Sequence, residues 1–407
     1  MHRSKKILND PVYGFVGIPD GIVFDIIEHP YFQRLRRIKQ TSLTHYVYPG
    51  ALHTRFHHAL GAFHLTNQAI DVLRSKDVDI NDEEAEALRI AILLHDIGHG
   101  PFSHTLENAL IQVHHETLSV LFMQKLNDEF GGKLNLAIQI FLDEYPKRFL
   151  NQLVSGQLDM DRMDYLNRDS FFTGVHEGVI GYDRIIKMLA VKDGELVVEE
   201  KGIYSVEKFL IARRLMYWQV YLHKTVLAAE QMLVQTLRRA RDLVESGFNL
   251  RATENLEFFL HHHLTEKDFE SKRDELLERF ARLDDYDVMS ALKSWMNADD
   301  SLLAYFSKCL IDRRLFKLEL RNEPFEADYI KEIRHKTEYW GAFSSEMTDY
   351  LVFSGMETNS AYSTSKDEIK ILHKDGRVLP MSATADYGIQ SKIVTKYYLC
   401  YPKEILR

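Results

Sequence analysis

Apolar residues recur at intervals of three and four positions along most of the chain, and this spacing places them on one face of an α-helix. Only 9 of the 407 residues are proline, so few positions would interrupt such helices. The pattern predicts a mainly α fold whose core is supplied by amphipathic helices.

Three segments carry the clearest helical pattern. The first begins with Asn81 as the N-cap, has acidic residues in its first turn, stays apolar through Leu94 and meets Gly98 as a stop. The other two are residues 115–128 and 205–246, and the second predicts one very long helix. One face of that helix would carry Arg213, Tyr217, Tyr221 and Lys224.

The signals for β-strands are shorter and lie mostly near the end of the chain. Residues 194–200 predict a short strand, residues 369–380 a hairpin with its turn at Asp375-Gly376, and residues 392–402 a third strand after that hairpin. We therefore predict two units, a helical core with its N-terminal segment (1–248) and a smaller α+β accessory region (249–407). We interpret the second unit as a support for assembly.

Composition and charge narrow the class of protein. Charged residues make up 27% of the chain and hydrophobic residues 45%, as in soluble globular proteins, and the net charge of −9 argues against a general binder of nucleic acids or membrane surfaces. With only Cys309 and Cys400, a disulfide framework is not expected. No segment has the ~20 apolar residues of a membrane span. We expect a soluble, cytoplasmic protein.

Histidines gather in one part of the chain: nine of the 19 lie between residues 53 and 115. A single histidine is most often a cap or a buried hydrogen-bonding group, but His95-Asp96 directly follows an apolar helix, where both side chains can reach a cation beyond the helix end. Gly98 and Gly100 predict a turn that bends His99 into a cleft, toward a substrate rather than the metal.

Two further stretches could complete a metal site. HTRFHHALG (53–61) precedes another amphipathic helix, and LDMDRMDYLNRD (158–169) holds four aspartates, Asp159, Asp161, Asp164 and Asp169. Two imidazoles with two carboxylates form a mixed nitrogen and oxygen set that suits Mn, Fe, Ni, Zn or Mg. A site of this kind with open positions favours hydrolysis of a phosphate ester.

These stretches resemble the HD-domain phosphohydrolases, whose H…HD…D set is matched by His58, His95, Asp96 and Asp161. The order and spacing of five segments are similar to those of the dNTP triphosphohydrolase branch, which includes bacterial dGTPases and the animal SAM-HD protein; the segments are 31–40, 48–61, 93–104, 115–116 and 158–169. The resemblance covers roughly residues 6 to 230. It implies an HD-type helical bundle with one divalent metal ion held by those four residues.

The same resemblance implies roles for residues around the metal. His99, His104 and His115 would surround the α-phosphate, one of them as general acid, and Glu107 stands where related members carry an aspartate that pairs with a catalytic histidine. The implied substrate-binding residues are Gln40 and Asp169 near the sugar, Arg55, Arg162 and Arg213 on the triphosphate, and Tyr165 and Tyr221 closing the pocket.

A second nucleotide site is also implied. Lys6, Ile7, Gln33 and Arg36 are similar to the segment by which regulated members bind an activating guanine nucleotide between subunits, and His223 and Lys224 match contacts to a second nucleotide. The alternative is that these residues form an N-terminal turn and a solvated basic helix face. From the resemblance we also expect a homo-oligomer, a dimer or tetramer.

The main hypothesis is thus a metal-dependent hydrolase that splits a dNTP into deoxynucleoside and tripolyphosphate. Two alternatives remain open. One is another HD-type phosphohydrolase, acting on a nucleoside monophosphate, a cyclic nucleotide or a guanosine polyphosphate. The other is a nucleotide-responsive scaffold whose metal is structural.

Overall fold

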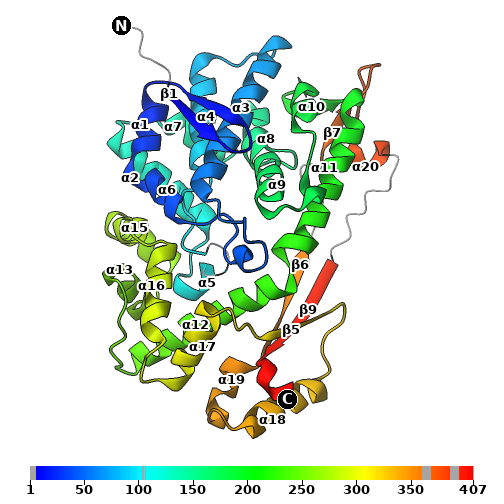
Figure 1. Cartoon of the computed structure of the whole chain (residues 1–407). Coiled ribbons are helices and arrows are strands. Elements are labelled where there is room, and N and C mark those ends of the chain that lie inside the picture. Colours follow the sequence, from blue (N-terminus) through cyan, green and yellow to red (C-terminus); the bar gives the residue numbers. More distant parts are fainter. Residues whose placement is uncertain (1–5, 103–104, 106, 360–367, 386–393, 407) are drawn as a thin grey trace.

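The computed structural model describes residues 6–102, 105, 107–359, 368–385 and 394–406. The predicted mainly α fold is confirmed, since helices make up most of these residues and the strands form small sheets (Figure 1). Within the described residues, no helix combines the length and the apolar character needed to cross a membrane.

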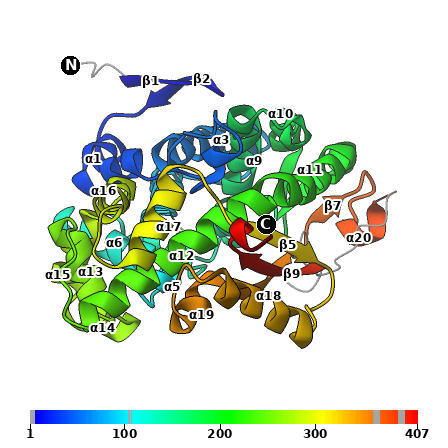
Figure 2. The same cartoon turned by 60° about the horizontal axis from the view of Figure 1, so that its bottom comes forward.

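The N-terminal half is a helical bundle with a β-hairpin on its outer edge (Figures 1 and 2). Its centre is the long helix α3, which packs against α4 and α9 and contacts strand β2 of the hairpin. The elements are β1 (Lys6–Asp10), β2 (Gly14–Ile18), α1 (Ile22–Glu28), α2 (Pro30–Gln33), α3 (Arg55–Ser75), α4 (Asp82–Leu94), α5 (Glu107–Leu110), α6 (His115–Glu129), α7 (Asn135–Phe141), α8 (Arg148–Ser155), α9 (Met160–Thr173) and α10 (Tyr182–Lys187).

Two of the predicted helices are confirmed, α4 and α6. The side chain of Asn81 accepts a hydrogen bond from the Glu84 backbone (2.9 Å), while the Glu84 carboxylate accepts from the Asn81 backbone (2.9 Å). This reciprocal capping box satisfies backbone donors that the first helical turn leaves without partners.

The single helix predicted over residues 205–246 is wrong. The structure has α11 (Ile203–Met216), a π-helical turn (Tyr217–Tyr221) and then α12 (Lys224–Glu245), with His223 as the N-cap of α12. The Tyr48 hydroxyl donates to the carbonyl of Gln219 (2.6 Å), so a distant side chain holds the interrupted turn. The predicted continuous face from Arg213 to Lys224 is therefore broken.

The β-strands form three sheets within the described residues. Strand β3 (Leu189–Lys192) pairs with β4 (Glu195–Glu199), and β4 pairs in parallel with β7 (Lys370–Leu372) of the predicted hairpin β7–β8 (Val378–Pro380). The predicted third strand is confirmed as β9 (Val394–Tyr401). It belongs to a different sheet from the hairpin and lies between β5 (Lys317–Arg321) and β6 (Phe353–Asn359).

The remaining helices belong to the second half of the chain. They are α13 (Glu254–His261), α14 (Glu266–Ser271), α15 (Arg273–Ala281), α16 (Asp285–Trp295), α17 (Ser301–Ile311), α18 (Ala327–Trp340), α19 (Thr348–Leu351) and α20 (Met381–Thr384). α12 packs against both α17 and β5, and one hydrophobic cluster extends from Val16 to Cys400. The boundary near residue 248 stays a prediction.

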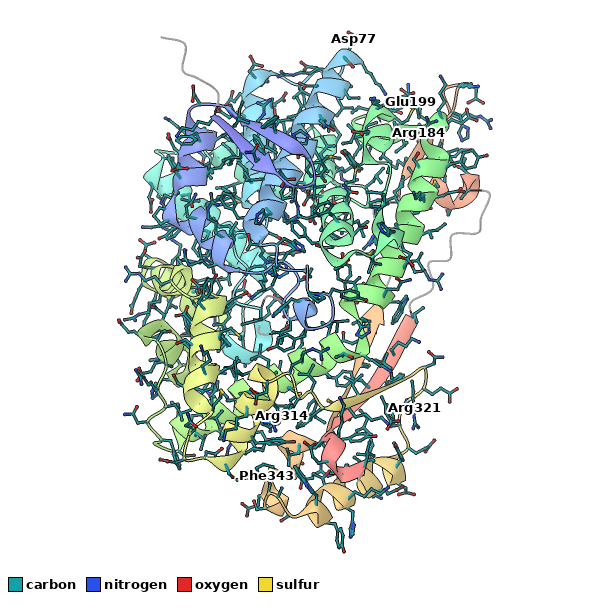
Figure 3. All side chains as sticks on the ribbon, in the orientation of Figure 1. Asp77, Arg184, Glu199, Arg314, Arg321 and Phe343 are labelled. Atoms are coloured by element: carbon teal, nitrogen blue, oxygen red, sulfur yellow. The ribbon has the colours of Figure 1, made fainter. Side chains whose placement is uncertain are left out.

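An ionic contact joins the C-terminal end of α3 to the sheet that contains β3 and β4. The Lys76 ammonium donates to Glu199 (2.7 Å) and to the carbonyls of Lys187 and Leu189 (2.8 and 2.7 Å). Asp77 and Glu199 mark this end of the molecule in Figure 3. The contact helps to hold the orientation of the helix that carries the first candidate metal ligand.

The close packing of α3 on α9 gives a prediction about Gly61. A Cβ atom at this position would overlap the side chains of Asp164 and Arg168 on α9. We expect Gly61→Ala to lower the free energy of unfolding by about 1–3 kcal/mol through overpacking, although alanine favours helices by about 1 kcal/mol. Urea unfolding measures the change. Gly17→Ala, where a Cβ meets nothing within 4 Å, is the control. A Gly61→Ala protein as stable as the wild type would contradict the packing.

Candidate active site

Three separate elements bring the candidate metal ligands together. His58 lies in the first turns of α3, His95 and Asp96 directly follow α4, and Asp161 lies in the first turn of α9. Each element has a defined start or end: His57 Nδ1 accepts from the Thr54 backbone at the start of α3 (3.2 Å), and the Asp159 side chain caps α9. The ligands are therefore held by helix ends within the bundle.

His58, His95 and Asp161 form a compact group whose ligand atoms all lie within 4.8 Å of one another. The two Nε2 atoms are 3.3 Å apart, and Asp161 Oδ1 lies 3.1 Å from His58 Nε2 and 3.5 Å from His95 Nε2. Ligands at about 2.0–2.2 Å from one ion would be about 3.0–3.5 Å from each other at ordinary bond angles. The spacing fits one divalent cation.

The tautomers of the two histidines are set by their other ring nitrogens. His58 Nδ1 donates to Asp164 Oδ2 (2.7 Å), and His95 Nδ1 donates to the carbonyl of Ile92 (2.6 Å). Each ring therefore directs the lone pair of Nε2 at the shared point, which is the arrangement that metal-binding histidines need.

The electrostatics of this point favour positive charge. Burial lowers the pKa of His58, but hydrogen bonds to Asp161 and Asp164 raise it more, to about 10. Burial acts against ionisation of Asp161, yet His58 and His95 hold its pKa well below the ordinary value. The Asp161 side chain is 27% exposed, whereas that of His58 is fully buried, so the group opens to solvent on the Asp161 side.

Asp96 lies beside this group and contacts more than one cationic or imidazole partner. Its Oδ1 is 3.4 Å from His95 Nε2 and 3.3 Å from His99 Nε2, and its Oδ2 is 3.7 Å from His58 Nε2 and accepts from Arg55. Asp96 therefore lies at the site, and its carboxylate contacts both the candidate ligands and Arg55.

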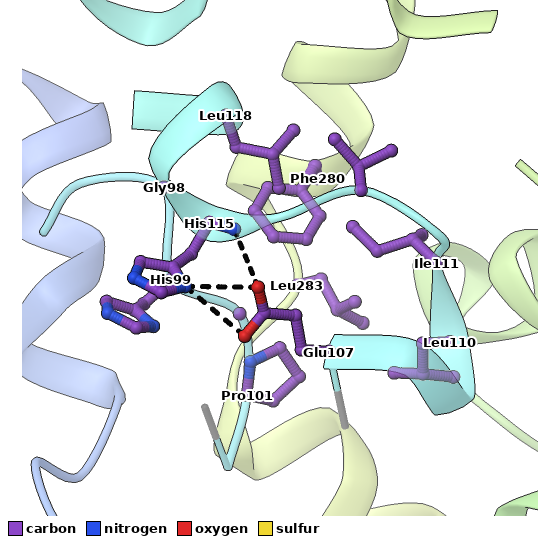
Figure 4. Close-up of a pocket in the computed structure, with 12 residues that line it drawn as sticks. Gly98, His99, Pro101, Glu107, Leu110, Ile111, His115, Leu118, Phe280 and Leu283 are labelled. Carbon is purple, nitrogen blue, oxygen red and sulfur yellow. Dashed lines mark hydrogen bonds and ion pairs between the residues drawn. The ribbon is translucent and has the colours of Figure 1, made fainter. Parts of the chain in front are cut away.

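His99, His115 and Glu107 form a second group next to the ligands. The rings of His99 and His115 stack with centroids 3.9 Å apart, and His115 Nδ1 lies 3.1 and 3.2 Å from the two oxygens of Glu107 (Figure 4). Burial and the nearby Arg55 hold the pKa of His99 well below its ordinary value. The predicted His104 lies outside the described residues.

His99, Glu107 and His115 also line a small pocket (Figure 4). Its walls are mostly apolar; they include Pro101, Leu110, Ile111, Val113, Leu118, Phe280 and Leu283. None of the candidate metal ligands lines it, and apolar walls do not solvate a polyphosphate. We therefore do not assign the substrate to this pocket.

Arg34 and Asp285 hold the loop that follows the HD doublet. Arg34 is fully buried and donates to the carbonyls of Ile97 and His99 (both 2.8 Å) and of Leu283 (3.3 Å). Asp285 accepts from the backbone of Phe102 (2.9 Å), and burial raises its pKa to about 6. Sequence reasoning missed both residues.

Asp169 is the centre of a polar network on α9. Its carboxylate accepts from His53 Nε2 (2.7 Å) and from the Tyr221 hydroxyl (2.6 Å), and the rings of Tyr221 and Tyr165 are 6.2 Å apart. Three of the predicted substrate-binding residues, Asp169, Tyr165 and Tyr221, therefore lie together, with His53 beside them.

The predicted phosphate and sugar residues have different partners. Arg162 pairs with Asp159 and donates to the carbonyl of Gly156 (2.5 Å). Arg213 Nη1 and Gln40 Oε1 are buried and have no hydrogen-bond partner among the described residues. A buried donor and acceptor without partners are expected where a ligand completes the bonding.

The predicted regulatory residues lie on two segments. Lys6 Nζ is 3.5 Å from the Phe24 ring centroid, and Gln33 joins Arg36 to α1 by accepting from Arg36 (2.8 Å) and donating to the Ile27 carbonyl (2.7 Å). Ile7 is 61% exposed on the hairpin. The other segment holds His223, which caps α12, and the exposed Lys224. Their roles stay predictions.

The comparisons with known proteins agree with this geometry. Residues 55–169 match the family model of the HD domain, and residues 180–261 match that of the HD associated region. The structure has a TM-score of 0.94 with the crystal structure of a phosphohydrolase from Bacteroides thetaiotaomicron, at 52% identity, covering 98% of this chain and 100% of that one.

Two curated relatives extend the comparison. The uncharacterized protein YwfO of Bacillus subtilis is 29% identical over 99% of this chain and 93% of its own. The deoxynucleoside triphosphate triphosphohydrolase SAMHD1 homolog of Dictyostelium discoideum is 32% identical over 58% of this chain. The match spans 50% of that longer protein.

The ligand group predicts a specific thermal response to metal. We expect Mn²⁺ at 100 times its dissociation constant to stabilise the wild type by about 2.7 kcal/mol, seen as a higher melting temperature. Asp161→Ala removes one of three converging ligands and should abolish this shift, while Asp71→Ala, on the exposed side of α3, should retain it. An equal shift in the Asp161→Ala protein would place the cation elsewhere.

Proposed function

Because the chain belongs to the HD-domain phosphohydrolases, we propose that it is a metal-dependent hydrolase that splits dNTPs into deoxynucleoside and tripolyphosphate. The observation that carries the proposal is the convergence of His58, His95 and Asp161 at one point that opens to solvent. A divalent cation held there would polarise a phosphoryl oxygen and lower the pKa of water.

The residues around the ligands suit a deoxynucleotide. Arg55 contacts Asp96, and Arg213 lies near enough to Asp159 and Tyr165 to lower their pKa values against the effect of burial, so both guanidinium groups are beside the ligands, where a polyphosphate would meet them. In the proposal, Arg162 contributes a third positive charge.

In the proposal, polar residues apart from the metal ligands recognise the sugar. Gln40 Oε1 offers an acceptor for a sugar hydroxyl, and the network of Asp169 with His53 and Tyr221 limits the space around it. Tyr221 and Tyr165, whose rings meet edge to face, would close the pocket against the base. These contacts orient the α-phosphate toward the ligand group.

Proton transfer is assigned to the second group. His115, oriented by Glu107, donates a proton to the departing 5′ oxygen of the deoxynucleoside. His99 stacks on His115, and its low pKa keeps it neutral near pH 7, so it positions the neighbouring ring without adding charge. The bond between the α-phosphorus and the 5′ oxygen breaks, and water supplies the new oxygen on phosphorus.

Regulation and assembly form part of the same proposal. An activating nucleotide at Lys6, Ile7, Gln33 and Arg36, with His223 and Lys224 from the start of α12, requires a homo-oligomer in which these segments meet. We place this dimer or tetramer in the cytoplasm.

The function is tested with the four dNTPs, each with Mn²⁺ and with or without GTP. We expect inorganic tripolyphosphate, measured by ion chromatography, from at least one dNTP, and none from the Asp161→Ala protein. Asp71→Ala serves as the active control. Release of phosphate or pyrophosphate in place of tripolyphosphate would indicate another HD-type phosphohydrolase. Nucleotide binding without hydrolysis would favour the scaffold.

The proton-transfer assignment predicts the effect of Glu107→Gln. The amide keeps the length of the side chain but removes the negative charge next to His115, so we expect kcat to fall about 100-fold with little change in KM. The pH profile of kcat should also shift, because a general acid loses its charged partner. Glu86→Gln, on the exposed face of α4, is the matched control. An unchanged pH profile would remove Glu107 from the proton-transfer group.

A further inference from the structure

A buried chain of charged side chains runs from the N-terminal hairpin to His58. It starts at Asp10, the last residue of β1, whose Oδ1 accepts from the backbones of Val12 and Tyr13 in the hairpin turn (both 2.9 Å). Its second oxygen lies 2.7 Å from Arg168 Nη1 on α9. One carboxylate thus holds the turn and contacts the bundle at the same time.

Arg168 continues the chain to the ligand group. Its Nε and Nη2 donate to the two oxygens of Asp164 (2.9 and 3.0 Å), and Asp164 Oδ2 accepts from His58 Nδ1 (2.7 Å). The exposed fractions are 7% for Asp10 and 0% for Arg168, Asp164 and His58. Water therefore does not screen these contacts, and a planar guanidinium fork fixes their directions.

The charges explain why the position of each side chain in this series depends on its neighbours. Arg168 lies between the carboxylates of Asp10 and Asp164, and Asp164 in turn lies between Arg168 and the imidazole of His58. Removal of one partner of a buried charged pair leaves the other uncompensated, which is costly. The position of Asp164, and with it the direction of the His58 ring, therefore depends on Arg168 and on Asp10.

We propose that Asp10 and Arg168 are positioning residues for His58, and that they couple the hairpin of residues 6–18 to the affinity of the metal site. The inference rests on the proposed function only in treating His58 as a metal ligand. The outer face of the hairpin carries Ile7 and Phe15, exposed by 61% and 74%. A displacement of the hairpin at Asp10 would remove one of the two carboxylates that hold Arg168 and so loosen the support that Arg168 gives to Asp164.

The test measures Mn²⁺ affinity without any nucleotide, by titration of the electron paramagnetic resonance signal of free Mn²⁺. We expect Asp164→Asn to weaken binding about 10- to 100-fold, as for other residues that orient a metal ligand. Asp10→Asn keeps an oxygen for the hairpin turn but loses the charge facing Arg168, and should weaken binding about 3- to 10-fold. Asp20→Asn, just after β2 and outside the chain of contacts, should bind as the wild type does.

A double substitution separates this coupling from a local role of Asp10 in the hairpin. If Asp10 acts through Asp164, the Asp10→Asn/Asp164→Asn protein binds Mn²⁺ as weakly as Asp164→Asn alone. Arg168→Lys keeps a positive charge without the fork, and should weaken binding at least as much as Asp10→Asn. Circular dichroism and melting temperatures establish that each variant is folded before its affinity is compared.

Three results would overturn the inference. They are an Asp10→Asn affinity equal to that of Asp20→Asn, a double variant whose loss is the product of the two single losses, and a wild type that binds no Mn²⁺. A wild type that binds Mn²⁺ but hydrolyses no dNTP overturns only the proposed substrate, because nucleotide takes no part in this experiment.

Discussion

The structure depends on the convergence of two imidazole lone pairs and a carboxylate at one point. His58 and His95 each use Nδ1 as a donor, so Nε2 of both rings faces Asp161. Lone pairs at this separation repel each other unless positive charge lies between them. A proton on His58, whose pKa is raised against the effect of burial to about 10 by Asp161 and Asp164, or a bound divalent cation would supply that charge.

One helix supplies most of what this arrangement requires. Asp161, Asp164 and Arg168 lie on α9 at intervals of three and four residues, so a single face offers a ligand, its orienting partner and a counter-charge. The absence of a side chain at Gly61 lets α3 approach this face closely enough for His58 to reach Asp164. The local sequence of α9 and one glycine thus determine the geometry around His58.

The sequence was sufficient where local patterns decide the structure. The N-cap at Asn81, the start of α6 and the resemblance to HD-domain phosphohydrolases could all be read from it, and all three are confirmed. Asp164 was visible in the acidic run after residue 158, but its orienting role depends on Arg168, four residues later. A search for i, i+4 pairs of opposite charge would have found that link.

Other features depend on contacts between distant segments. The π-helical turn within 205–246 is contacted by the distant Tyr48, and β9 pairs with β5 and β6, which precede it by more than 30 residues. No local signal joins Asp10 to Arg168, which lie 158 positions apart. Periodicity reports which face of a segment is buried, and it does not identify the partner that buries it.

The contacts that hold the loop after His95-Asp96 determine which fragments of this chain can keep its structure. The residues that match the HD domain begin at 55 and end at 169, yet Arg34 precedes them and Leu283 and Asp285 follow them. A fragment cut to the matched range would keep every ligand and lose the guanidinium that gathers the Ile97 and His99 carbonyls. The residues that match the HD domain are therefore not a self-contained unit in this chain, because the loop after His95-Asp96 is held by segments on both sides of the match.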